Sequence, residues 1–175
     1  LCTPVEKNVE YLKILKTIIK DDCIITDVGS VKENIHKAVK ILDMEKNFIG
    51  GHPMAGSEKT SYEHASDRLL ENAYYPITPT DAVDNKYIEE YTQIVSDIGA
   101  IPIKIDYREH DRVVAAISHL PHLIASSLVN LVKHNDSKLE YMKTFAAGGF
   151  KDITRIASSS PEMWEQICMT NNINI

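Results

Sequence analysis

The sequence predicts an α/β unit followed by an all-helical unit, and two observations support this division. Up to about residue 106, short apolar runs alternate with helical patterns, which is typical of a largely parallel sheet covered by helices. After residue 107 one long apolar helical pattern dominates, and nothing strand-like follows it. We therefore expect two units, residues 1–106 and residues 107–175.

In the α/β unit, the first two helices each begin with a pair of residues that matches a capping box. These pairs are Thr3 with Glu6 and Ser30 with Glu33. Pro76 cannot donate a ladder hydrogen bond, so we expect it at a sheet edge or a bulge. The remaining expected elements are a helix over residues 84–98 and strands over residues 23–27, 47–50, 73–80 and 100–105.

In the helical unit, apolar residues from Arg108 to about His134 repeat at helical spacing and form one broad stripe. Pro121 is expected to kink this helix. Ser160 and Pro161 predict the start of a last helix, over residues 161–170. A helical domain with such a broad apolar face often completes its core with a second subunit, so we expect a homodimer.

Composition argues against several classes of protein. The 175 residues carry a net charge of −6, which argues against binding to nucleic acid or to an acidic membrane surface. No apolar run reaches the roughly 18 residues of a membrane span, and no signal-peptide pattern opens the chain. We therefore expect a soluble cytoplasmic protein. The three cysteines are widely spaced, which argues against disulfides and a metal–thiolate site.

Two segments lie where parallel strands are expected to end, which is the edge of an α/β sheet at which ligands bind. The first segment, residues 26–32, carries Asp27 and Ser30. The second segment, residues 50–58, holds His52 between two glycines and a proline, where a histidine can act as a general base. The alternatives are that Ser30 only caps a helix and that His52 is an ordinary loop residue.

The long helix carries a polar group around its proline. Asp111, Ser118 and His122 fall on one helical face, with His119 beside them. A solvated polar face is the alternative interpretation. A metal site on His119 and His122 is less favoured, because no carboxylate or cysteine lies at a matching short spacing.

Lys151 and Arg155 form a further candidate group. They lie four residues apart, so they share one face if this segment is helical. Two cations on one face could clamp a carboxylate, with arginine as the better bidentate donor. An ordinary charged face is the alternative.

Four motifs, taken together, resemble the prephenate dehydrogenase family. They are TDVGSVK, GGHPMAGSEK, ISHLPHLIA and GGFKDITRIA followed by PEMW, and they occur in the family's order and at about its spacings. The resemblance covers nearly the whole chain. It implies the C-terminal half of a Rossmann-type parallel sheet, as a partial dinucleotide-binding domain over residues 1–106. It also implies part of a helical substrate and dimerisation domain over residues 107–175.

The resemblance implies a reaction, the oxidative decarboxylation of prephenate to 4-hydroxyphenylpyruvate in tyrosine biosynthesis, with hydride transfer to NAD. His52 matches the catalytic histidine that accepts the proton of the substrate's ring hydroxyl. Ser30 matches a serine between that histidine, the substrate and the nicotinamide, and Arg155 matches an arginine that binds a substrate carboxylate. The other matches are Ser118, His119, His122, Glu58, Asp111, Lys151 and Trp164 on the substrate side, and Thr3, Pro4 and Asp27 on the cofactor side.

The family's dinucleotide fingerprint, G-x-G-x-x-G, does not occur in the chain. The family carries it on a first strand and turn that we expect to precede Leu1. We therefore predict that these 175 residues by themselves bind NAD weakly or not at all. The acidic residue that distinguishes NAD from NADP belongs to the same region, so both cofactors stay open.

Three other functions stay open from the sequence. The first is arogenate dehydrogenase, which performs the same chemistry on the amino-acid analogue of prephenate. The second is a truncated fragment that folds and dimerises without catalysis. The third is a metal-dependent hydrolase built on His52, His119 and His122.

Overall fold

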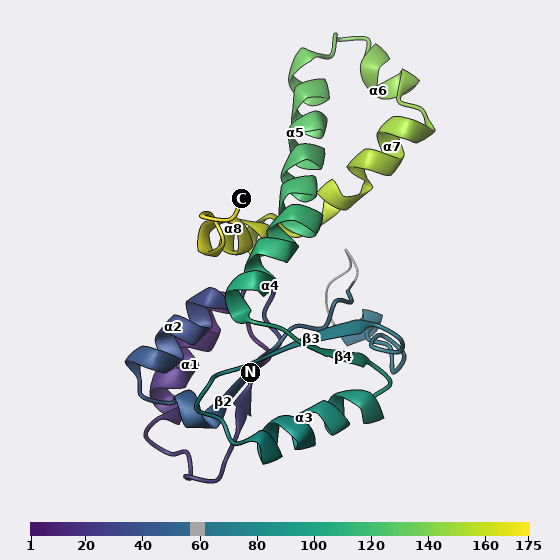
Figure 1. The fold of residues 1–175 in the computed structure, drawn as a ribbon. Helices are drawn as coiled ribbons and strands as arrows, with labels where there is room; N and C mark the ends of the chain where they lie inside the picture. Colours follow the sequence, from purple (N-terminus) through teal and green to yellow (C-terminus); the bar gives the residue numbers. More distant parts are fainter. Residues whose placement is uncertain (57–61) are drawn as a thin grey trace.

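The computed structural model describes residues 1–56 and 62–175, in which a four-stranded sheet carries helices on both faces and a long helix projects from it (Figure 1). This arrangement confirms the predicted order of an α/β unit and an all-helical unit. The elements are α1 (Val5–Leu15), β1 (Ile25–Thr26), α2 (Glu33–Ile41), β2 (Phe48–Gly51), β3 (Tyr74–Pro79), α3 (Asn85–Asp97), β4 (Ile101–Lys104), α4 (Tyr107–Val114), a π-helical turn (Ala115–His119), α5 (Leu120–Asn135), α6 (Tyr141–Phe145), α7 (Gly148–Thr154) and α8 (Pro161–Thr170). Short 3₁₀ turns lie at Glu45–Asn47, Tyr62–His64 and Arg155–Ser158.

The sheet has the order β1-β2-β3-β4 and is mixed. β1 pairs with β2 in parallel and β3 pairs with β4 in parallel, whereas β3 runs antiparallel to β2. The largely parallel character that the sequence predicts therefore has one exception. On the outer side of β1, the amino group of Leu1 donates to the Thr26 carbonyl, and the Leu1 carbonyl accepts from the Val28 N–H. These bonds place Leu1 beside β1 in the manner of a parallel strand.

Pro76 lies inside the sheet, so the expectation of an edge position is wrong. β3 is hydrogen-bonded to β2 on one side and to β4 on the other. The Pro76 carbonyl accepts from the His52 N–H at 3.1 Å, but Pro76 has no N–H to return. β2 ends at the preceding residue, Gly51. The proline therefore coincides with the end of the ladder, where His52 leaves the sheet.

Two apolar clusters hold the helices against the two faces of the sheet. One cluster includes Leu12 and Phe48 and joins α1 and α2 to one face, and the other includes Ile49 and Val95 and joins α3 to the opposite face. Phe48 and Ile49 are neighbours in β2, so they point to opposite faces. In a third cluster, Ile167 packs α8 against the start of α1 and the loop after β1. α8 therefore returns from the helical unit to the loop that follows β1.

The predicted side-chain cap is present at the start of α8 and absent at the start of α1. The Ser160 hydroxyl accepts from the Met163 N–H, as expected of an N-cap. The Thr3 hydroxyl instead donates to Asn8 Oδ1 at 2.6 Å, and α1 has no side-chain cap. The capping box of Thr3 with Glu6 is therefore not formed.

The long helix contains a π-helical turn at Ala115–His119, shortly before Pro121. This turn rotates the faces of α5 relative to those of α4. Because a π-helical turn holds more residues than an α-helical turn, Asp111 does not share a face with Ser118 and His122 as expected. Asp111 points to α2, where it accepts from the N–H groups of Lys32 and Glu33, both at 2.8 Å. A side chain of α4 thus supplies the cap that the sequence assigned to Ser30.

The segment Tyr107–Asn135 is one continuous helix with a partly uncovered apolar face. By length and composition alone it could cross a membrane, a test that core helices of soluble proteins also pass. Its exposed apolar side chains are Ile117, Leu120, Ile124, Val129 and Leu131. Apolar side chains in this arrangement favour contact with another protein surface.

Candidate active site

Two adjoining cavities lie beside the ends of β1 and β2, where the sequence predicts a ligand site. The first cavity, of about 380 Å³, lies between residues 3–5, the loop after β1 and α8. The second cavity, of about 510 Å³, lies between residues 52–56, the start of α5, the turn after α7 and α8. Both are lined by Ser30, Met163 and Ile167. Ser30 therefore stands at the boundary between them.

The second cavity gathers most of the predicted substrate-side residues. The Trp164 ring stacks on the His122 imidazole, with centroids 3.6 Å apart and planes inclined by 5°. Trp164 Nε1 is buried and has no hydrogen-bond partner among the described residues, so it is free to donate to a ligand. Besides Ser30, the predicted residues that line this cavity are His52, Ser118, His119, His122, Arg155 and Trp164.

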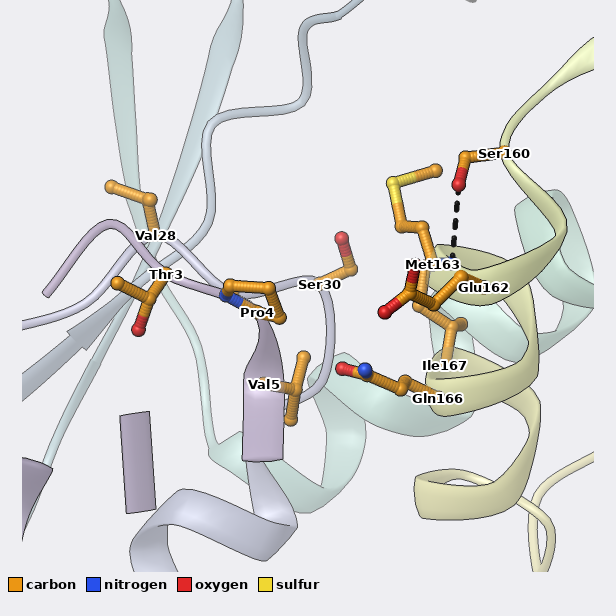
Figure 2. A pocket seen from close by; sticks show the side chains of 11 residues that line it. Thr3, Pro4, Val5, Val28, Ser30, Ser160, Glu162, Met163, Gln166 and Ile167 are labelled. Carbon is orange, nitrogen blue, oxygen red and sulfur yellow. Dashed lines mark hydrogen bonds between the residues drawn. The ribbon is translucent and has the colours of Figure 1, made fainter. Parts of the chain in front are cut away.

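The first cavity is lined by the predicted cofactor-side residues Thr3, Pro4 and Ser30. Figure 2 shows Glu162 and Gln166 of α8 facing them across the cavity. Its lining combines apolar surface with hydroxyl, carboxamide and carboxylate groups. This chemistry suits the nicotinamide and ribose of a dinucleotide better than its pyrophosphate, because none of the described lysines and arginines lines the cavity.

Asp27 lines neither cavity, although the sequence assigned it to the cofactor. Its buried carboxylate accepts from the N–H groups of Gly29 at 2.9 Å and Gly51 at 3.2 Å. It also pairs with the ammonium group of Lys32, which donates to the Gly51 carbonyl at 2.6 Å. The pair of Asp27 and Lys32 therefore ties the end of β1 to the end of β2 and positions the loops beside both cavities.

A close approach in the loop after β1 requires glycine. A Cβ atom on Gly29 would lie 2.8 Å from Asp27 Oδ2, which is shorter than real Cβ contacts. The carboxylate can therefore bind this turn only because Gly29 has no side chain.

The histidines of the second cavity are held in their neutral form. Burial, reinforced by His110, Lys32 and His119, holds the pKa of His52 well below its usual value. Burial likewise lowers the pKa of His119 to about 4. Near neutral pH His52 is therefore uncharged, and a neutral imidazole can accept a proton.

The sequence did not indicate His110, which contacts His52 and does not line the second cavity. Its Nε2 lies 2.9 Å from His52 Nδ1, and its Nδ1 lies 2.7 Å from Asp111 Oδ1. The only sequence signal was a histidine followed by an aspartate at the start of a helix. The sequence could not indicate that His110 meets a residue 58 positions away.

Among the predicted substrate-side residues that the structure describes, Lys151 and Asp111 do not line the second cavity. Lys151 lines a separate cavity of about 590 Å³ between α5, α6 and α7. α7 ends at Thr154 and Arg155 begins a 3₁₀ turn, so the two cations do not continue along one helical face. Glu58 lies outside the described residues. Within residues 1–56 and 62–175, no group of three His, Cys, Asp or Glu side chains is placed to hold a metal ion.

Comparison with known proteins assigns both parts of the chain to one family. Residues 1–104 match the family model described as prephenate dehydrogenase, nucleotide-binding domain, and residues 106–175 match the one described as prephenate dehydrogenase, dimerization domain. The prephenate dehydrogenase of Bacillus subtilis (strain 168) is 41% identical over 177 residues, which cover 100% of this chain and 48% of that protein.

Two solved structures are similar over 99% of this chain. One is prephenate dehydrogenase from Aquifex aeolicus in complex with hydroxyphenyl propionate and NAD+, with a TM-score of 0.91, 36% identity and 60% of that chain covered. The other is Synechocystis arogenate dehydrogenase, with a TM-score of 0.84, 30% identity and 63% covered. The chain thus spans about half the length of the curated relatives it matches. The family expected from the four motifs is confirmed, and the chain belongs to the prephenate dehydrogenase family.

Proposed function

We propose that this chain supplies the substrate side and the nicotinamide side of an NAD-dependent prephenate dehydrogenase. The observation that carries the proposal is that His52, whose pKa is lowered by burial, lines the second cavity, while Ser30 lines both this cavity and the first. A hydride donor carbon in one cavity and a hydride acceptor in the other would meet at the boundary between the two cavities. When bound in the first cavity, NAD would supply the hydride acceptor.

In this proposal His52 accepts the proton of the substrate's ring hydroxyl. Removing that proton raises electron density on the ring carbon that releases hydride. Proton removal by His52 therefore assists hydride transfer. Loss of the ring carboxylate as carbon dioxide leaves its bonding electrons in the ring, which becomes an aromatic phenolate, and His52 then returns the proton to the ring oxygen. Formation of the aromatic ring makes the reaction strongly downhill. The protein mainly has to position the reacting groups and hold the base neutral.

Prephenate carries two carboxylates, whereas the chain has a net charge of −6, so recognition requires local donors. Among the described residues, Arg155 is the permanent cation that lines the second cavity, and we assign it to one substrate carboxylate. Ser118, His119 and the Trp164 indole N–H are neutral donors on the same wall. The stacked His122 and Trp164 rings offer a flat surface to the substrate side chain.

Substitution of the base is the first prediction. In the protein that contains this chain, His52→Asn should lower kcat with prephenate and NAD by about 10²- to 10⁴-fold, because no group accepts the hydroxyl proton. Formation of reduced cofactor and of 4-hydroxyphenylpyruvate measures this rate. His134→Asn is the matched control, because His134 is exposed on α5 and, among the described residues, bonds only to the Asn130 carbonyl. Wild-type turnover in His52→Asn would contradict the proposed role.

Arogenate is the second candidate substrate, because a Synechocystis arogenate dehydrogenase shares the fold at 30% identity. The ratio of kcat/KM for prephenate and arogenate distinguishes the two, and we expect prephenate to be preferred. Absence of turnover with both substrates would favour a non-catalytic role.

We also propose a homodimer in the cytoplasm. The match to a dimerization domain and the exposed apolar side chains of α5 support the dimer. Cys2, Cys23 and Cys168 are all unpaired, which is consistent with a reducing compartment.

A further inference from the structure

His110 is a buried histidine that links the proposed base to a carboxylate. It is 1% exposed and lies between His52 and Asp111, with hydrogen-bond distances of 2.9 Å and 2.7 Å. His110 lines neither the first nor the second cavity. His110 therefore acts on a ligand there through neighbouring residues, of which His52 is the one it contacts in the second cavity.

The Asp111 carboxylate sets the direction of this chain of hydrogen bonds. It accepts from the backbone N–H groups of Lys32 and Glu33 at the start of α2, where a negative charge is favoured. A carboxylate in this setting only accepts, so His110 donates to it from Nδ1. A neutral His110 then has a lone pair on Nε2, which accepts from His52 Nδ1–H.

We propose that His110 is a positioning residue that holds His52 in the tautomer with its proton on Nδ1 and a lone pair on Nε2. Because Nδ1 is occupied by His110, Nε2 is the ring nitrogen left for the second cavity. A general base needs this lone pair. This proposal rests on the proposed function only in naming the substrate hydroxyl as the group that gives its proton to His52. The tautomer of His52 is set by the protein without substrate.

A second histidine of the cavity, His119, is held in the opposite tautomer by a different partner. Asn171 Nδ2 donates to the Asp111 carbonyl at 2.9 Å, and Asn171 Oδ1 accepts from Asn174 at 2.7 Å, which determines how the amide is oriented. The same Nδ2 lies 3.0 Å from His119 Nδ1, which must accept. His119 therefore carries its proton on Nε2. The cavity presents one histidine as an acceptor and one as a donor, each set by its buried partner.

NMR of isotope-labelled histidine nitrogens in the 175-residue chain measures the tautomer of His52 directly, with His52→Asn identifying its signals. We expect a protonated Nδ1 and an unprotonated Nε2. In His110→Phe the acceptor is lost, and the His52 proton should move to Nε2. In His110→Gln the side-chain oxygen can accept the same bond, so the Nδ1–H form should return.

Kinetics of the protein that contains this chain give a second readout. His110→Phe should lower kcat by about 10²- to 10⁴-fold, because His52 cannot act as a base when it is held in the wrong tautomer. KM should change by less than about threefold, because His110 touches no ligand. His110→Gln should recover at least about tenfold of the lost kcat, because it restores the acceptor.

His36→Phe is the matched control for loss of a buried histidine. His36 is 5% exposed, bonds to Thr78 and stacks on Tyr107, and it makes no hydrogen bond to His52. Its substitution should leave the His52 tautomer unchanged even if the chain is less stable.

An Nε2 proton on His52 in the unmodified chain would overturn the proposal. So would an Nδ1 proton that persists in His110→Phe. If the expected tautomers are found but prephenate is not turned over, the proposed function fails while the positioning role stands.

Discussion

At the scale of single residues, Lys32 is a lysine without exposed side-chain surface, and it joins two loops beside the candidate site. Its Nζ lies 2.5 Å from Asp27 Oδ2 and 2.6 Å from the Gly51 carbonyl. Burial lowers the pKa of Lys32, and the neighbouring Asp27 opposes that shift. Removing one member of such a pair leaves the other as an uncompensated buried charge.

Substitution of this lysine should therefore destabilise the chain strongly. Lys32→Met should lower the free energy of unfolding by about 3–5 kcal/mol, as for other broken buried pairs, measured by urea denaturation. Lys37→Met is the control, because Lys37 pairs with Glu33 on the surface of α2 and its loss should cost less than about 1 kcal/mol. Equal stability of Lys32→Met and the unmodified chain would contradict this account.

The positions of single site residues were partly predictable from the motifs. His52, His119 and Arg155 were candidates from motif and residue type, and all three line the second cavity. Asp27 was expected at the cofactor, but it lies in a buried ion pair. His110 was not expected, because its role depends on a contact that no local pattern encodes.

At the scale of elements, β2 illustrates how a strand brings two loops together. It pairs with β1 on one side and β3 on the other, and it ends where His52 begins its loop. Gly50 packs tightly within this strand. A Cβ atom there would lie 2.3 Å from Thr78 Oγ1 and 3.1 Å from His36 Nε2, two atoms that are hydrogen-bonded to each other.

A methyl group at Gly50 should therefore disrupt the packing of the sheet against α2. Gly50→Ala should cost about 1–3 kcal/mol of unfolding free energy, as overpacked sites do. In Gly148→Ala the added Cβ meets nothing within 4 Å, so this variant should be neutral or slightly stabilising. Thermal denaturation of both variants checks the contrast, and comparable stabilities would refute it.

Element positions were predictable wherever local signals agreed. Ser160 and Pro161 predicted the start of α8, and the structure has this helix at Pro161–Thr170. Pro76 was placed wrongly, because its missing N–H excludes only one hydrogen bond. That bond falls opposite His52, where β2 has already ended.

At the scale of the whole molecule, the long helix projects away from the sheet (Figure 1). It carries several exposed apolar side chains. Leu131 is 59% exposed and Ile124 is 49% exposed on α5. Burial of such side chains between two copies would contribute most of the dimer's stability.

A charge on this face should weaken the proposed dimer. Leu131→Glu should raise the dissociation constant by about 10- to 100-fold, because a carboxylate would be buried without a partner. Analytical ultracentrifugation over a range of concentrations measures this change. Ile41→Glu, at an 80% exposed position on α2, is the control and should associate like the unmodified chain. An unmodified chain that stays monomeric at high concentration would reject the dimer.

The sequence alone determined the order of strands and helices, the change from α/β to all-α, and the family, because periodicity, turn residues and linked motifs are local in the chain. Only the tertiary structure decided the antiparallel β3, the burial of Asp27 with Lys32, and the meeting of His52 with His110, 58 residues apart. These contacts join segments that are far apart in the sequence. Their geometry follows from the packing of the whole core rather than from neighbouring residues in the chain.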